Sequence, residues 1–230
     1  MIRAVPVRRS LLTESAEVGD LMDHTPQSAY AHLRDTQPRW FLTPQGDSAI
    51  GIMRWPMVEG QVLHRDEDRV VLEDPVILPD GQHARRLRLL SARPEHQVAV
   101  LPLLADSVVL TERFQHATRT WHWEILRAPG VEGLADTDNA AGQLQDQLAA
   151  SASELIGLGQ VHPDPYVLAD PVLLYAGRID TVGEVAAAGG IRRACTVPFA
   201  EAEEMALTGL ITDAVTISSL FRARQTGLTG

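Results

Sequence analysis

Three polar side chains, Gln143, Asp146 and Gln147, occur at positions i, i+3 and i+4 of the segment DNAAGQLQDQLAA. On a helix this spacing brings all three to one face. Carboxylates on such a face can hold Mg²⁺, a hard ion that depends on oxygen ligands with negative charge. Two of the three residues here are neutral glutamines. The segment therefore keeps the shape of a cation site and lacks most of its charge.

Histidines and acids elsewhere in the chain offer a second kind of chemistry. His162 opens the segment HPDP and is followed by Asp164 and Asp170. Histidine is the commonest general acid or base near neutral pH, so His162 with one of these acids is a candidate acid–base pair. His116 and His122 are further candidates. The sequence contains no P-loop, dinucleotide-binding GxGxxG, GxSxG or HExxH motif.

A helix must position the first group of residues. Apolar residues recur every four positions over about 139–150, which predicts a helix whose N-cap is Thr137 or Asp138. The predicted buried stripe consists of Ala140, Leu144 and Leu148. Two closing helices are expected over 200–207 and 212–224, separated by a break at Gly209.

Short runs rich in Val, Leu and Ile predict strands in two groups. The first group makes a small antiparallel sheet with a turn at Pro79-Asp80-Gly81, because Pro presets φ and Gly accepts a positive φ. The second group includes a hairpin around Ala105-Asp106. The predicted strands are 60–65, 68–78, 83–92, 98–104, 107–114, 122–126, 155–161 and 171–179. Their order, with one internal helix and two closing helices, predicts a mixed α/β sandwich.

Composition excludes several classes of protein. All 20 basic residues are arginine and they face 30 acidic residues, so the formal net charge of -10 argues against nucleic acid as a partner. Cys195 is the single cysteine, so it forms no intrachain disulfide, and we expect it to pack in the core. No run approaches the roughly 18 apolar residues of a membrane span. We therefore expect a cytoplasmic protein with no membrane partner.

Five stretches in the same order resemble the Nudix hydrolase superfamily, and within it the branch of ADP-ribose pyrophosphatases. They include the LPDGQ turn, the segment AVLPLLADSVVLTERFQHATRTWHWEIL, and a closing segment with Glu201, Gly209, Asp213 and Thr216. The stretches are 70–90, 99–126, 127–150, 158–177 and 197–224. The resemblance covers about 52–225. It implies a Nudix-type α/β/α sandwich preceded by a small N-terminal antiparallel sheet.

The resemblance places the Nudix box on 127–150, and the box is degenerate. Ala128 falls on its first glycine, and two of the three metal-binding glutamates are read as Gln143 and Gln147. The third is read as Asp146, and the box arginine as Gly142. Removing these charges weakens both the binding of Mg²⁺ and the polarisation of a bound water. A loss of several kcal/mol of metal catalysis lowers a rate by about 10³-fold or more.

The resemblance also implies the remaining site residues. A weak or absent Mg²⁺ site is expected at Asp146, Glu124 and Ala128, and no other cofactor is expected. The usual phosphate-pairing arginine is read as Gln115, so Arg113 or Arg119 could take its place. The predicted catalytic residues are Gln143, Asp146, Gln147, His162 and Asp170, and the predicted substrate-binding residues are Arg113, Gln115, Arg119 and Glu124.

Three hypotheses for function follow. The first is a divergent Nudix protein that acts on or binds a small nucleoside-diphosphate-linked ligand, with metal-dependent hydrolysis reduced or lost. The second is a Nudix-fold enzyme repurposed for a non-hydrolytic or biosynthetic reaction with His and Asp groups, and the third is a non-catalytic ligand-binding protein. The expected organisation is an extension of unassigned role over 1–51, with one helix-like stretch at Ser28–Leu33, an N-terminal sheet over 52–96 and a Nudix domain over 97–230. The branch commonly forms homodimers, so a homodimer is expected here.

Overall fold

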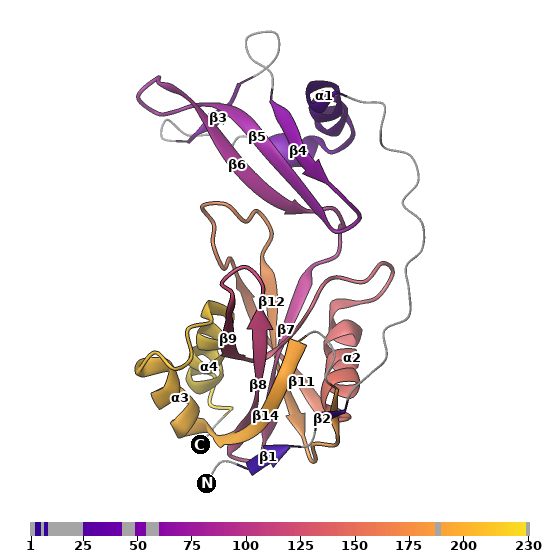
Figure 1. The fold of residues 1–230 in the computed structure, drawn as a ribbon, viewed down its shortest axis with the longest axis vertical. Coiled ribbons are helices and arrows are strands. Elements are labelled where there is room, and N and C mark those ends of the chain that lie inside the picture. The colour runs from indigo at the N-terminus through magenta and orange to yellow at the C-terminus, as the bar shows by residue number, and fades with distance from the viewer. Residues whose placement is uncertain are drawn as a thin grey trace. The chain divides into compact units, whose positions relative to one another are not determined.

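The structure, a computed structural model, describes residues 3–5, 7–8, 25–42, 49–53, 60–186 and 190–228. The chain folds into two compact units, and each combines segments that are distant in sequence (Figure 1). Unit 1 contains Met1–Thr13, Pro94–Pro163 and Pro171–Gly230, and unit 2 contains Glu14–Arg93 and Asp164–Asp170.

The two units do not follow the three predicted segments. The segment predicted as an extension is shared, because strand β1 (Arg3–Val5) pairs within unit 1 and helix α1 (Pro26–Thr36) belongs to unit 2. The loop that follows His162 belongs to unit 2. The carbonyl of Leu89 accepts from the N–H of Ala169 at 3.0 Å, and the N–H of Leu89 donates to the carbonyl of Val167 at 2.8 Å. Backbone hydrogen bonds to distant strands thus decide which unit these two segments belong to. The hydropathy of the segments themselves does not indicate this.

The main sheet of unit 1 is mixed, with the strand order β1-β14-β8-β7-β12-β11. Strands β7 and β8 pair directly only beside their connecting turn, at Leu103–Val108 and Leu104–Ser107. Farther along, β8 pairs with β9 and β7 pairs with β10, so the sheet splits there. The other strands are β7 (Gln97–Leu104), β8 (Ser107–Gln115), β9 (Thr120–Glu124), β10 (Leu126–Ala128), β11 (Ala152–Val161), β12 (Val172–Ile179) and β14 (Ile191–Pro198). A separate pair, β2 (Val7–Arg8) with β13 (Val185–Ala186), is parallel.

Helices cover both faces of this sheet, and the predicted mixed α/β/α sandwich is confirmed (Figure 1). Helix α2 (Asp136–Leu148) packs on one face and buries the predicted stripe of Ala140, Leu144 and Leu148 completely. Helices α3 (Phe199–Leu207) and α4 (Ala214–Gln225) pack on the other face. The buried thiol of Cys195 lies in that second core, as expected, and burial raises its pKa.

The predicted N-cap of α2 is wrong. The helix begins at Asp136, after Ala135, without a side-chain cap, and both Thr137 and Asp138 are exposed. The first turn is held instead by Asn139, whose buried amide Nδ2 donates to the carbonyl of Pro129 at 2.9 Å. A tertiary hydrogen bond therefore replaces the local cap that the sequence suggested.

Unit 2 is a four-stranded antiparallel sheet covered by α1. Strand β5 pairs along its whole length with β6, and with β3 and β4 on its other side. The turn Pro79-Asp80-Gly81 forms as predicted: Gly81 has a φ of 82°, and the N–H of Leu78 donates to the carbonyl of Gln82 at 2.8 Å. The elements are η1 (Pro38–Phe41), β3 (Gly51–Ile52), β4 (Gln61–Arg65), β5 (Arg69–Ile77) and β6 (His83–Ser91).

A buried polar contact fastens α1 to this sheet. The hydroxyl of Tyr30 donates to Oδ1 of Asp74 at 2.5 Å, and Arg88 also pairs with that buried carboxylate. Burial and the hydrogen bond to Asp74 raise the pKa of Tyr30 far above its usual range. A Cβ at Gly60 would lie 2.2 Å from the Tyr30 ring, so the ring requires glycine there.

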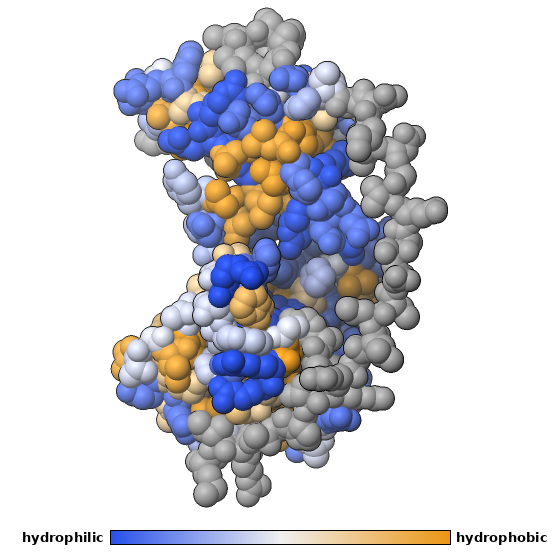
Figure 2. All heavy atoms as spheres, viewed as in Figure 1, coloured by the Kyte–Doolittle hydropathy of each residue, from blue (hydrophilic) through white to orange (hydrophobic). Residues whose placement is uncertain are grey.

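Large apolar side chains remain exposed on both units, and Figure 2 shows several such areas on one side of the molecule. On unit 2 they are Leu42, Ile50, Leu63, Ile77, Leu87 and Tyr166, and on α3, α4 and the loop between them they are Leu207, Leu210, Ile217 and Phe221. Among the described residues, no helix combines the length and the apolar character needed to cross a membrane.

Candidate functional site

Two glutamine amides form the helix side of the candidate site. Gln143 and Gln147 lie one turn apart on α2, and Nε2 of Gln147 donates to Oε1 of Gln143 at 2.6 Å. Oε1 of Gln147 in turn accepts from Nη2 of Arg113, on β8, at 2.7 Å. The helical spacing thus places both amides on one face of α2, and the partly buried oxygen Oε1 of Gln147 accepts from an arginine of the same chain.

Arg113 connects the amides to a buried carboxylate. Its Nε lies 3.1 Å from Oε1 of Glu124, whose side chain is only 2% exposed. The other carboxylate oxygen accepts from Nε2 of Gln115 at 2.7 Å. Burial raises the pKa of Glu124, against the opposing effects of Gln115 and Arg113, and burial lowers the pKa of Arg113. These five predicted residues therefore form one connected polar cluster near the split between β7 and β8.

A second arginine, which sequence reasoning missed, joins this cluster. The carbonyl of Arg127 on β10 accepts from Nε2 of Gln147 at 3.4 Å, and its guanidinium pairs with Asp213. Asp213 caps α4 and accepts from the backbone N–H and the hydroxyl of Thr216 at 2.8 and 2.6 Å. Burial alone would raise the pKa of Asp213, but the charge and hydrogen bond of Arg127 outweigh it and hold that pKa below its usual value.

A signal for Arg127 was present in the sequence. Asp213 and Thr216 were already among the residues that carry the Nudix resemblance. Arg127 directly precedes Ala128. The family pattern has a small residue at position 127, so a long cationic side chain there departs from the pattern. Its partner Asp213 is 86 residues away in sequence, and only the fold brings the two together.

Three buried atoms in the cluster have no hydrogen-bond partner in the described structure: Nε of Arg113, Oε1 of Glu124 and Nε of Arg127. The contact between Arg113 and Glu124 is close enough for an ion pair but does not have hydrogen-bond geometry. A buried donor or acceptor without a partner costs about 1–3 kcal/mol. The cluster therefore has unused hydrogen-bonding capacity on both arginines.

The structure leaves other predicted residues outside the cluster. Asp146 is exposed and makes no hydrogen bond or ion pair with the described residues, and Ala128 is buried. Arg119 is exposed, with its guanidinium 5.2 Å from the centre of the Phe114 ring and 2.9 Å from Nδ1 of His116.

The predicted acid–base residues are also outside the cluster. His162 is exposed and has no hydrogen bond to the described residues. Asp164 and Asp170 belong to unit 2, where Asp170 accepts from the backbone N–H of Ser91. His122 contacts the hydroxyls of Thr118 and Thr212 at 2.7 and 3.2 Å.

The cluster does not fit a Mg²⁺ ion. Over the part of the chain that the structure describes, no three His, Cys, Asp or Glu side chains are grouped to hold a metal. The two buried carboxylates, Glu124 and Asp213, are each paired with an arginine. Oε1 of Gln147 already accepts from a guanidinium and Oε1 of Gln143 from Gln147, and neutral amides are poor ligands for a hard divalent cation. The cluster thus pairs two guanidinium groups with two carboxylates, and this pairing leaves no carboxylate free to hold a metal.

Comparison with known proteins supports the fold and does not extend to activity. The chain is similar to the crystal structure of an ADP compounds hydrolase, with a TM-score of 0.61 and 14% sequence identity. The match covers 77% of this chain and 93% of that chain. No family model matches the sequence, and no curated protein matches it either. The chain therefore shares the mixed α/β fold of that structure, while the identity is too low to transfer a function.

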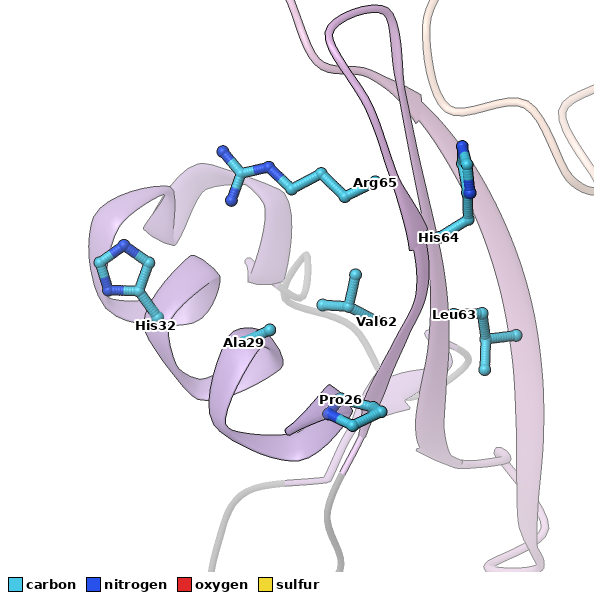
Figure 3. A pocket seen from close by; sticks show the side chains of 7 residues that line it. All are labelled: Pro26, Ala29, His32, Val62, Leu63, His64 and Arg65. Atoms are coloured by element: carbon cyan, nitrogen blue, oxygen red, sulfur yellow. The ribbon is translucent and has the colours of Figure 1, made fainter. Parts of the chain in front are cut away.

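Unit 2 contains a cavity of about 400 Å³ between α1 and β4 (Figure 3). Figure 3 shows Val62 and Arg65 on the side of the strand that faces the helix. The residues that line this cavity are Pro26, Ala29, His32, Val62, Leu63, His64 and Arg65. His64 pairs with Asp66 at 2.9 Å. None of the predicted site residues lines this cavity, so it is separate from the cluster.

Proposed function

We propose that this protein binds a small nucleoside-diphosphate-linked ligand at the cluster on α2, β8 and β10, and that metal-dependent hydrolysis of this ligand is reduced or lost. The observation that carries the proposal is the hydrogen bond from Arg113 to Gln147. In the family, carboxylates on this face of the helix bind the metal. On α2 the face carries the amide of Gln147 instead, which accepts a hydrogen bond from the guanidinium of Arg113.

The magnitude of the expected loss supports binding over hydrolysis. Metal catalysis supplies several kcal/mol of transition-state stabilisation, and each 1.36 kcal/mol changes a rate about tenfold. Replacing the two box glutamates with Gln143 and Gln147 removes two formal charges, whereas arginines can still pair with phosphate oxygens. Ligand affinity is therefore retained more readily than turnover.

The experiment compares the native protein with the double variant Gln143→Glu, Gln147→Glu. We expect ADP-ribose to raise the melting temperature of the native protein, and AMP release to stay at background with or without Mg²⁺. Gln145→Glu is the matched control, because Gln145 lies on the same helix but is exposed, and among the described residues its side chain hydrogen-bonds only to Ser151, at 3.3 Å. Rapid Mg²⁺-dependent AMP release by the native chain, or no effect of ADP-ribose on melting, would contradict the proposal.

The homodimer stays a prediction. It is tested by light scattering on the full chain after size-exclusion chromatography, where a mass near twice 25.1 kDa is the expected result.

A further inference from the structure

The cavity between α1 and β4 in unit 2 has an apolar part and a basic part (Figure 3). Pro26 and Ala29 from the helix and Val62 from the strand form apolar walls. Val62 also packs against the core of unit 2, so the cavity borders that core. Its volume of about 400 Å³ lies within the range of about 300–1,000 Å³ that is typical of small-molecule sites.

The sequence of α1 explains why there is space here. Tyr30 and Leu33 face the sheet and are buried. Pro26, Ala29 and His32 are spaced three residues apart, so they share a neighbouring face of the helix, and all three line the cavity. The middle residue of this face, Ala29, has only a methyl group. A longer side chain there would occupy part of the space between α1 and β4.

The basic part of the cavity has no acidic counterpart. Three of the lining residues, His32, His64 and Arg65, have basic side chains, and no Asp or Glu is among the described residues that line the cavity. The exposed guanidinium of Arg65 makes no hydrogen bond or ion pair with the part of the chain that the structure describes. Figure 3 shows Arg65 on the side of β4 that faces α1, opposite His64.

The acid that follows Arg65 in the sequence does not neutralise it. Oδ2 of Asp66 lies 2.9 Å from Nε2 of His64. Oδ1 of Asp66 accepts from the backbone N–H groups of Asp68 and Arg69 at 2.8 and 2.7 Å. Both carboxylate oxygens are therefore engaged within the turn between β4 and β5, and the charge of Arg65 is available to a ligand.

We propose that this cavity binds a small carboxylic acid with an apolar body. The carboxylate pairs with the guanidinium of Arg65, which accommodates two carboxylate oxygens side by side, and the apolar body lies against Ala29 and Val62. A diphosphate carries more charge than one guanidinium can neutralise and gains nothing from apolar walls. The proposal is independent of the proposed function, because no residue of the polar cluster lines this cavity.

The test follows the backbone amides of the full-length protein by NMR during titration with octanoate. Saturable shifts confined to α1 and β4 are expected. Octanamide has the same apolar body without the charge, and we expect it to bind at least about fivefold more weakly, the loss of one ion pair. Acetate has the charge without the apolar body and is expected to produce no saturable shift.

Two variants separate the charge from the apolar walls. Arg65→Gln is expected to weaken octanoate binding about 5- to 10-fold, between the contribution of an exposed ion pair and that of a buried charged hydrogen bond. Ala29→Leu keeps the charge and suits a helix, and it is expected to abolish binding because leucine fills the cavity.

Arg69→Gln is the matched control and is expected to bind octanoate like the native protein. Arg69 is an exposed arginine of the same hairpin, but it does not line the cavity, and Nη1 of its side chain donates to the carbonyl of Asp68 at 3.0 Å.

Thermal melting checks that each variant folds. If Ala29→Leu does not fold, the comparison of Arg65→Gln with Arg69→Gln decides, because both arginines are exposed. The proposal is overturned if octanoate causes no saturable shifts in α1 and β4, or if octanamide or inorganic phosphate binds as tightly as octanoate. It is also overturned if folded Arg65→Gln binds octanoate as tightly as Arg69→Gln, or if folded Ala29→Leu binds it as tightly as the native protein.

Discussion

Glu112 shows how a single residue couples stability to pH. Its buried carboxylate accepts three bonds from two arginines: Nε and Nη2 of Arg192 at 2.8 and 2.6 Å, and Nε of Arg193 at 2.6 Å. The hydrogen bonds from Arg192, and then those from Arg193, overcome burial and lower the pKa of Glu112 to about 2. The unfolded value is about 4.3. The stabilisation is therefore fully present above about pH 4.3 and is lost as the pH falls toward 2.

The variant Glu112→Gln is predicted to melt at a lower temperature than native protein at pH 7. The difference should shrink as the pH falls from about 4.3 to 2, because the native carboxylate becomes protonated over that window. Thermal melting followed by circular dichroism at several pH values measures it. A gap between the two proteins that stays constant across this range would show that the ion pairs with Arg192 and Arg193 do not supply the stability.

Gly60 is a second residue whose substitution is expected to change stability, because there is no room for a side chain at this position. A methyl group there would lie 2.2–2.6 Å from carbons of the Tyr30 ring, and that ring is held by its hydroxyl on Asp74. Gly60→Ala is predicted to destabilise unit 2 by about 1–3 kcal/mol through overpacking. The gain from a less flexible unfolded chain, about 0.4–1 kcal/mol, is smaller. Chemical denaturation measures the change, and a variant as stable as native would contradict the close packing of Tyr30.

Residue-scale prediction worked where local geometry decides contacts. Gln143 and Gln147 are one helical turn apart, so their hydrogen bond could be foreseen from spacing. Asp146 was expected on the same face, yet adjacent helical residues differ by about 100°, and the cluster faces the Gln147 side. Asp146 is consequently exposed. The side of α2 that faces Arg113 depends on how the helix packs on the sheet, and this packing cannot be predicted from the spacing of residues along the helix.

At the scale of elements, helix α2 offers a simple test of helix propensity. Gly142 lies within it, and a Cβ built there meets no atom within 4 Å. Gly142→Ala is predicted to stabilise the protein by about 0.5–1 kcal/mol, because alanine loses less backbone entropy in a helix. Gly177→Ala on β12 is the contrasting variant, since its Cβ would lie 2.7 Å from Leu144 and should destabilise. Loss of stability in Gly142→Ala, measured by denaturation, would contradict the open environment of that position.

The elements themselves were predicted best where turn chemistry and periodicity agree. The hairpin at Ala105-Asp106 and the turn at Pro79-Asp80-Gly81 form where expected. Strand β14 was not foreseen, although it pairs with β8 on one side and with the edge strand β1 on the other. Its sequence, IRRACTVP, combines two adjacent arginines with a short apolar run, so alternation alone does not reveal it.

At the scale of the whole molecule, the two units have separate cores. Leu72 is fully buried in the core of unit 2, with Tyr30 and Leu33 from α1, while the cores of unit 1 contain none of these residues. Leu72→Ala removes buried volume and is predicted to destabilise unit 2 by about 2–5 kcal/mol. Amide hydrogen exchange should then accelerate in β4–β6 and α1, whereas β7, β8 and β12 keep native protection. Equal acceleration in both sheets would show that the units unfold together.

Residue type and local spacing are enough to predict the elements with regular periodicity, the order of strands that resembles a Nudix fold, and the loss of charge on the α2 face. The folded chain is needed to see that Arg113 and Arg127 both bond to Gln147 on that face, and that Asp213, 86 residues from Arg127, pairs with Arg127. The same holds for residues 164–170, which pair with β6 in unit 2. Folding brings buried charges and unpaired backbone groups of distant segments into contact, where they satisfy each other. A local sequence pattern does not identify the partner of such a group.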